Sequence, residues 1–251
     1  MVPLDGDLSA ATVRSVFLGD AHLGHAPGPV HQQVIEFVDG LAADRLFLLG
    51  DLFDFLVGLG GAAPAHADPV LAALTRAADR GVAVIYVEGN HDFHLRPLLD
   101  PRIVVWPGPG DVDLGQTRVH LAHGDEIQRS DPGYAILRPL IRSAPLITAA
   151  RLAGSALVHR LGRGSAETSR SLRAGRSRDW RAEKLRYVRR RIETGCDLVV
   201  LGHSHQLFTE QVGAGWVLQV GRFDRREQHA VLDGRRLQLR EGRRLVFERD
   251  I

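Results

Sequence analysis

Five short clusters of aspartate, asparagine and histidine are the residues of this chain best suited to chemistry. Carboxylate, amide and imidazole groups suit Mn²⁺, Fe²⁺, Zn²⁺ or Mg²⁺, whereas a single cysteine disfavours a soft or structural metal site. One such cluster alone is most often a turn or a hydrogen-bonded histidine, but five in one chain indicate a shared metal site. The clusters are Gly19-Asp20-Ala21-His22, Gly50-Asp51, Gly89-Asn90-His91-Asp92, His123-Gly124-Asp125 and Gly202-His203-Ser204-His205.

A short apolar run precedes each cluster. Runs of this length are typical of buried strands, and the carboxyl ends of strands in an α/β sheet converge on one crevice. We therefore expect the five clusters to lie close together. The runs cover 15–18, 46–49, 82–87, 119–122 and 198–201.

Two cations suit this number of ligands better than one. When they lie about 3.5–4 Å apart, two cations can bridge a phosphate, lower the pKa of a shared water to about 7 and stabilise a leaving oxygen. One carboxylate must then contact both cations. Asp51, the single ligand-type residue of its cluster, is the candidate.

The five clusters, in this order, resemble the calcineurin-like metallophosphoesterase superfamily. The resemblance implies two divalent cations, and we expect Mn²⁺, with Fe²⁺, Zn²⁺ or Mg²⁺ as alternatives. It implies that His91 protonates the leaving group and that Asp92 orients His91. It assigns Asp20, His22, Asp51 and His205 to the first cation, and Asp51, Asn90, His123 and His203 to the second.

A narrower resemblance is to the UDP-2,3-diacylglucosamine diphosphatases of lipid A biosynthesis. It depends on the segments 20–24, 50–58 and 89–93, and above all on Asp131-Pro-Gly-Tyr134 after the fourth cluster. It implies hydrolysis of the pyrophosphate bond of UDP-2,3-diacylglucosamine to lipid X and UMP. The chain departs from the family pattern in three places, namely Asp54, His91 and Gln206-Leu207, and the departure at His91 bears on the substrate more than on hydrolysis.

The remaining pattern predicts an α/β architecture. Apolar residues at helical spacing predict helices over about 30–43, around 70–78 and over about 178–194. The superfamily resemblance implies a four-layer αββα sandwich with an inserted helical cap. Short alternating segments separated by glycine turns predict closing strands at 206–212, 215–221, 228–232, 236–240 and 244–248.

The segment 126–195 differs from the rest of the chain in charge. It holds 16 Arg and Lys against 6 Asp and Glu, a net charge of +10, although the whole chain has a net charge of only +2. We expect this segment to form a helical cap over a core made of 1–125 and 196–251. Pro139 and Pro145 should break its first half into short helices.

A basic cap with apolar blocks fits a lipid that carries phosphate groups. Arginine grips phosphate bidentately, so Arg129, Arg176 and Arg178, with Asp131 and Tyr134, are candidates for substrate binding. The alternative is that these arginines are a solvated surface. Nucleic acid ranks lower because no series of aromatic residues accompanies the charge.

Two features of the sequence bear on location. No uncharged apolar run reaches 18 residues, and the first residues lack the pattern of a signal peptide. We therefore expect a cytoplasmic enzyme that associates peripherally with the cytoplasmic face of the inner membrane. Other functions stay open, namely another cytosolic metal-dependent phosphomonoesterase or phosphodiesterase, or a catalytically dead scaffold that binds partners.

Overall fold

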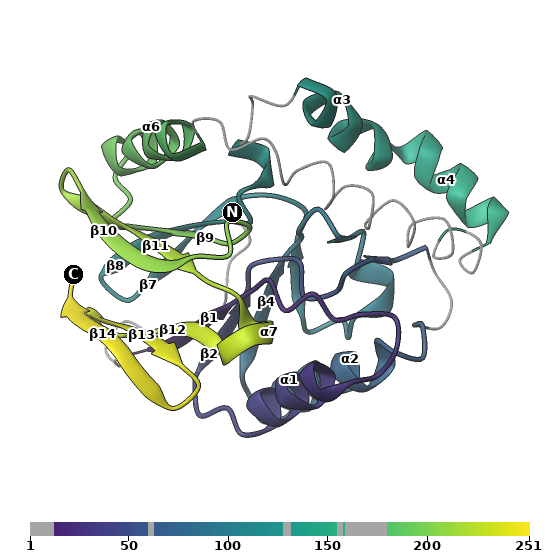
Figure 1. Cartoon of the computed structure of the whole chain (residues 1–251), viewed down its shortest axis with the longest axis horizontal. Coiled ribbons are helices and arrows are strands. Elements are labelled where there is room, and N and C mark those ends of the chain that lie inside the picture. The colour runs from purple at the N-terminus through teal and green to yellow at the C-terminus, as the bar shows by residue number, and fades with distance from the viewer. Residues whose placement is uncertain (1–12, 60–62, 128–131, 155–157, 159–179) are drawn as a thin grey trace.

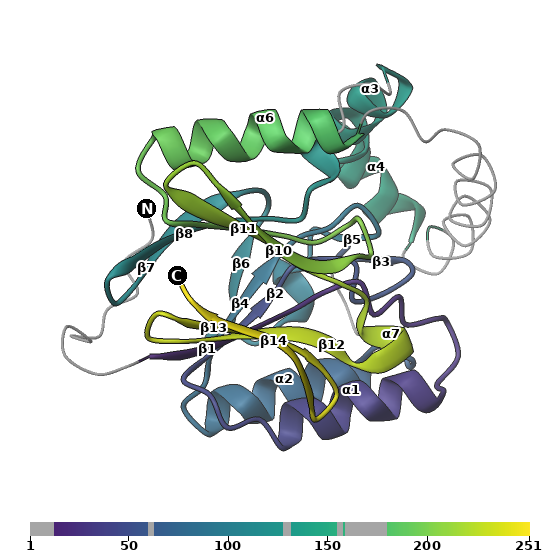
Figure 2. The same cartoon turned by 60° about the vertical axis from the view of Figure 1, so that its left-hand side comes forward.

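The computed structural model describes residues 13–59, 63–127, 132–154, 158 and 180–251, and every structural statement below concerns these residues. Two β-sheets pack face to face, and helices cover the outer face of each sheet (Figures 1 and 2). The expected four-layer αββα architecture is therefore confirmed.

The first sheet has seven strands in the order β14-β13-β12-β1-β2-β4-β6. Strands β1, β2, β4 and β6 run parallel, whereas β12, β13 and β14 form antiparallel hairpins beside β1. The bounds are β1 Arg14–Leu18, β2 Arg45–Leu48, β4 Ala83–Val87, β6 Val104–Trp106, β12 Gln228–Asp233, β13 Arg236–Glu241 and β14 Arg244–Asp250.

The second sheet has five strands in the order β10-β11-β9-β8-β7. Its three central strands are parallel, and its two edge strands are antiparallel. A separate two-stranded parallel sheet joins β3 to β5. The bounds are β7 Gly110–Leu114, β8 Thr117–Ala122, β9 Leu198–Leu201, β10 Leu207–Val212, β11 Gly215–Val220, β3 Leu56–Val57 and β5 Asp92–Phe93.

Apolar side chains from both sheets fill the space between them. Phe17 and Phe47 stack with ring centroids 5.0 Å apart on the inner face of the first sheet. Leu121, Val200 and further residues of the second sheet belong to the same buried cluster. This shared core fixes the two sheets relative to each other, and hence the loops at their strand ends.

Helices α1 (Pro29–Asp39) and α2 (Asp68–Asp79) cover the outer face of the first sheet. Helix α1 begins at a proline suited to the first turn. It ends at Gly40, so it is shorter than the predicted helix over 30–43.

Helix α6 (Trp180–Glu193) covers the outer face of the second sheet (Figure 2). Val188 is fully buried in a cluster with residues of β8, β9 and β11, and Leu185 and Ile192 pack against it. The expected helix over about 178–194 is present, but it forms the outer layer of the sandwich instead of part of a cap. The reason is that the apolar face of this helix packs against the apolar outer face of the second sheet.

Helices α3 (Pro132–Ile141) and α4 (Ala144–Ala153), which we call the helix pair, lie beside one end of the sandwich (Figures 1 and 2). Ile147 is buried against Val57, Leu59 and Phe93, which contributes about 1.5–3 kcal/mol. The predicted break at Pro139 is wrong because α3 continues through it to Ile141. Pro145 instead occupies the first turn of α4.

The short elements complete the fold. Strands β6 and β7 were not expected from the sequence. The apolar run of β6 has only three residues, and β7 alternates aspartate with apolar residues. None of the helices in the described part of the chain is long and apolar enough to span a bilayer. The remaining helical turns are η1 Arg96–Leu98, η2 Asp125–Ile127 and α7 Phe223–Arg226.

Candidate metal centre

The five polar clusters follow β1, β2, β4, β8 and β9, all at the same end of the sandwich. Backbone hydrogen bonds join neighbouring loops directly. The amide of Asp20 donates to the carbonyl of Gly50 over 3.1 Å, and that of Gly202 donates to the carbonyl of His123 over 2.9 Å. The convergence expected from the strand pattern is therefore present.

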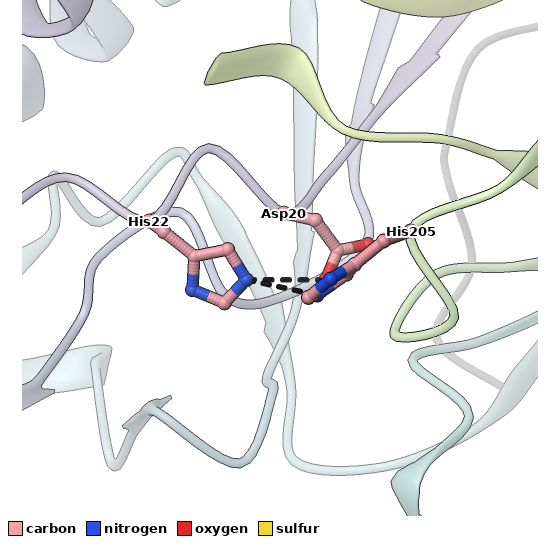
Figure 3. A group of neighbouring side chains, drawn as sticks. All are labelled: Asp20, His22 and His205. Carbon is pink, nitrogen blue, oxygen red and sulfur yellow. Dashed lines mark hydrogen bonds and ion pairs between the residues drawn. The ribbon is translucent and has the colours of Figure 1, made fainter. Parts of the chain in front are cut away.

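Asp20, His22 and His205 form a first group (Figure 3). Their ligand-type atoms all lie within 4.8 Å of one another. The Nε2 atoms of His22 and His205 are 3.0 Å apart, and Asp20 Oδ1 lies 3.8 and 3.5 Å from them. This carboxylate oxygen is buried and has no hydrogen-bond partner among the described residues, so its lone pairs are available to a cation.

Asp51, His123 and His203 form a second group. His123 Nε2 is 3.3 Å from Asp51 Oδ2 and 3.2 Å from His203 Nδ1. The Asn90 side-chain oxygen is also 3.2 Å from His123 Nε2, so four side chains face one point. Asp51 belongs to this group by distance, and its contact with both cations stays a prediction.

The ring of His123 is fixed by its other nitrogen. His123 Nδ1 lies 2.6 Å from the carbonyl oxygen of Leu49, so it must donate its proton there. Nε2 then carries a lone pair directed at the second group when the ring is neutral. A buried carbonyl thus selects the tautomer that a metal ligand requires.

The negative charges of Asp20 and Asp51 are balanced by neighbouring imidazoles. Burial raises the pKa of Asp51, but the positive charges of His123 and His91 lower it more, and this pKa lies well below its usual value. Burial and then the charge of His123 lower the pKa of His203 to about 3. Within the described residues, all ion pairs of Asp20 and Asp51 are with histidines.

Residues at these positions fit divalent cations. Two buried carboxylates, an amide oxygen and four histidines supply hard oxygen and imidazole ligands. A cation in each group would also balance the buried negative charge, which is costly to leave uncompensated.

The backbone is left-handed at most of the proposed ligands. Seven non-glycine residues of the described chain have positive φ, and five are Asp20, His22, Asp51, His203 and His205, with φ between 46° and 65°. Each such residue costs about 1–2 kcal/mol. Strain of this kind gathers at functional sites, where surrounding contacts maintain it.

We call the loops that carry the five polar clusters the metal loops. Two glycines allow these loops to approach each other. A Cβ atom on Gly50, where φ is +76°, would lie 2.6 Å from the Cα of Gly89. A Cβ atom on Gly89 would lie 2.2 Å from Asp51 Oδ1. Neither position has room for a side chain, which explains why both clusters begin with glycine.

Asp54 contacts both His22 and His91, a role that the sequence interpretation missed. The carbonyl oxygen of Asp54 accepts from His91 Nδ1 over 2.8 Å, and its carboxylate lies 3.5 Å from His22 Nδ1. His91 Nε2 is consequently turned toward the centre, 4.0 Å from Asp51 Oδ2. The available signal was a second acidic residue three positions after Asp51.

Asp92 does not orient His91, contrary to the role that the resemblance implied. Its buried carboxylate accepts hydrogen bonds from the amides of Asp51, Leu52, Phe53 and Gly89 and from the Tyr86 hydroxyl, over 2.6–3.2 Å. Burial, and then the charge of Asp51, raise the pKa of Asp92 to about 7. Asp92 therefore holds the Asp51 loop against β4, because its two oxygens are occupied by these hydrogen bonds.

Most of the candidate substrate-binding residues lie outside the part of the chain that the structure describes. Arg129, Asp131, Arg176 and Arg178 fall outside the described residues. The backbone of Tyr134 lies in α3, but its side chain is not described. Their assignment stays a prediction.

Sequence comparison supports the chemistry of this centre. A sequence model of the calcineurin-like phosphoesterase family matches residues 13–207. The UDP-2,3-diacylglucosamine hydrolase of Photorhabdus laumondii is 30% identical over 133 residues, which cover 51% of this chain and 55% of that protein. The match thus spans about half the length of that relative. The enzyme of the same name from Xanthomonas oryzae is 27% identical over 241 residues, covering 88% of this chain and 94% of its own.

Structural comparison supports the architecture. Vacuolar protein sorting 29 of Cryptosporidium parvum matches with a TM-score of 0.50 and 15% identity, covering 96% of this chain and all of that one. At this identity the likeness concerns the fold alone.

Proposed function

Because this chain belongs to the calcineurin-like phosphoesterase family, and is therefore a metal-dependent phosphoesterase, we propose that it hydrolyses the pyrophosphate bond of UDP-2,3-diacylglucosamine, giving lipid X and UMP. Water adds to one phosphorus, the bridging P–O bond breaks, and the departing phosphate takes a proton. Relatives named for this substrate match 51% and 88% of the chain.

The observation that carries this substrate is the exposed apolar surface of the helix pair. Seven large apolar side chains of the described chain are exposed, and five of them lie on α3 and α4. A surface of this kind is suited to acyl chains, whose burial contributes about 0.8 kcal/mol per CH₂. The five are Ile136, Leu137, Leu140, Leu146 and Leu152.

The proposed site holds two cations, which we assign as Mn²⁺. Asp20, His22 and His205, with Asp51, hold the first, and Asp51, Asn90, His123 and His203 hold the second. Such a pair supplies Lewis acidity and activates water when bound. The phosphate would bind at the cations that these residues would hold.

His91 is the proposed general acid. The hydrogen bond from its Nδ1 to the carbonyl of Asp54 leaves Nε2 facing the centre. A proton on Nε2 can pass to the bridging oxygen as the P–O bond breaks. Asp92 acts indirectly in this proposal, by holding the Asp51 loop.

The proposed cap provides the rest of substrate binding. Asp131 and Tyr134 would contact the substrate, and Arg129, Arg176 and Arg178 would bind its phosphate groups. The segment 126–195 stays our proposed insertion, with α6 as the part that packs on the core. The apolar face of the helix pair would meet the cytoplasmic surface of the inner membrane, where the lipid substrate resides.

A comparison of three substrates tests the proposal. With Mn²⁺ present, hydrolysis of UDP-2,3-diacylglucosamine should far exceed that of UDP-N-acetylglucosamine and of p-nitrophenyl phosphate, because remote binding energy then positions the reacting phosphorus. Equal values of kcat/KM for all three would reject the lipid substrate and leave a phosphoesterase of another specificity.

A further inference from the structure

We propose that Arg138 and Arg142, which we call the arginine pair, are positioning residues that hold two of the metal loops in register with the helix pair. Arg138 lies in the last turn of α3, and Arg142 is the first residue after that helix. This inference rests on the metal ligands proposed above but not on the identity of the substrate.

Arg138 connects α3 to the loop that carries His123. Its Nε donates to Asp125 Oδ2 over 2.6 Å. The Asp125 side chain is fully buried, whereas that of Arg138 is 22% exposed. Asp125 follows His123 by two residues, so this ion pair fixes the loop immediately beyond a proposed metal ligand.

Arg142 connects the junction of α3 and α4 to the loop that carries Asn90 and His91. Its two terminal nitrogens donate to the carbonyl oxygens of Gly89 over 2.5 Å and of Pro107 over 2.7 Å. The same guanidinium lies 3.4 Å from Glu88 Oε2 and 5.2 Å from the centre of the Phe93 ring. The Gly89 carbonyl belongs to the peptide bond that enters Asn90.

The chemistry of these contacts requires arginine. Asp125 and Glu88 are both buried, and a buried carboxylate that loses its cation is strongly destabilised. The contacts of Arg142 diverge to two carbonyls and one carboxylate, which a planar fork of donors can satisfy but a single ammonium cannot. Lysine at position 142 should therefore restore charge without restoring the geometry.

The consequence concerns the reacting centre. The arginine pair sets the positions of Asn90, His91 and His123 relative to the helix pair, and displacement of a reacting group by about 1 Å can cost 10²-fold in rate. Any substrate that contacts the helix pair would thereby meet the metal centre at a fixed distance.

Hydrogen–deuterium exchange of the full-length protein at saturating Mn²⁺ tests the contacts. In Arg142→Gln the amides of 89–91 should exchange faster, and in Arg138→Gln those of 123–127 should. Arg151→Gln is the matched control, because Arg151 lies exposed on α4. Exchange that is unchanged in both variants, or faster across the whole chain in either, would overturn the proposal. Arg142→Lys provides the second measurement if Arg142→Gln fails to fold.

Kinetics and Mn²⁺ titration test the consequence. For Arg142→Gln we expect kcat/KM to fall about 10–100-fold on bis(p-nitrophenyl) phosphate, a small substrate, and on UDP-2,3-diacylglucosamine, with partial rescue in Arg142→Lys and a change below twofold in Arg151→Gln. Mn²⁺ affinity should fall in both variants of the pair. Loss on the lipid substrate alone, with wild-type Mn²⁺ affinity, would reject positioning. If the wild type shows no preference for the lipid substrate, the proposed substrate fails while both readouts still test the pair.

Discussion

The metal loops and the helix pair lie side by side but are maintained by different physics. The metal loops have left-handed backbone at five residues and are joined by backbone hydrogen bonds, as between Asp20 and Gly50. The helix pair exposes large apolar side chains, up to 86% for Leu152, and is fixed by Ile147 and the arginine pair. The difference indicates that the metal centre has a fixed geometry, whereas the helix pair, our proposed surface for substrate capture, has few internal constraints.

The largest expected effect is on the metal loops. Asp51→Asn keeps the volume of the side chain and tolerates the left-handed backbone, but removes the charge of the proposed bridging ligand. We expect kcat to fall by more than about 10³-fold in a folded protein, measured with Mn²⁺ and with circular dichroism as the control. Activity above a few per cent of wild type would reject the assignment of this carboxylate.

The next effect separates proton transfer from metal binding. His91→Asn should lower kcat by about 10²–10⁴-fold, since the proton donor is lost, while the bound Mn²⁺ measured by mass spectrometry stays at the wild-type level. The loss should be larger on phenyl phosphate, whose basic leaving group needs a proton, than on p-nitrophenyl phosphate, whose leaving group needs little protonation. An equal loss on both substrates would argue against a general acid.

Two isoleucine-to-alanine substitutions, one in the sandwich and one in the helix pair, compare how much each region contributes to stability. Ile85→Ala, between the sheets, should lower Tm by roughly 5–15 °C because it leaves a cavity in the shared core. Ile147→Ala, on the buried face of α4, should change Tm by less than about 2 °C but speed proteolysis within 132–153. Equal shifts in Tm would show that the helix pair unfolds together with the sandwich.

The smallest expected effect is on the pH dependence of the free energy of unfolding, through Lys184 of α6. Burial and then the charge of Arg181 lower the pKa of Lys184 from 10.5 to about 8. Between these values the unfolded chain binds more protons, so the free energy of unfolding should rise with pH across this window, and the penalty is complete below it.

Lys184→Met should remove that slope and raise the free energy of unfolding at pH 7 by about 1–2 kcal/mol. Urea unfolding between pH 7 and 10.5 checks this. Parallel curves for the variant and the wild type would show that Lys184 is well solvated, and hence that α6 packs less tightly than its buried Val188 indicates.

The metal loops could be predicted from the sequence better than the packing of the helices and the role of Asp92. The arrangement of the metal loops follows from local pattern, because apolar runs such as 46–49 define strands whose ends must converge. The role of Asp92 could not be predicted in this way, since its hydrogen bonds reach amides some forty residues away. The helix over 180–193 was expected, but its place was not, because periodicity reveals an apolar face without revealing which surface covers it.

The left-handed backbone at five proposed ligands lowers the stability of the fold, although the side chains at these positions are the ones that metal binding needs. Glycine adopts this conformation without the cost of a Cβ atom, so a lineage released from metal binding could gain stability by replacing His203 or His205 with glycine. The presence of aspartate and histidine at these strained positions is therefore what we expect if the side chains bind metal. Variants selected only for resistance to heat should accordingly lose these side chains among the first.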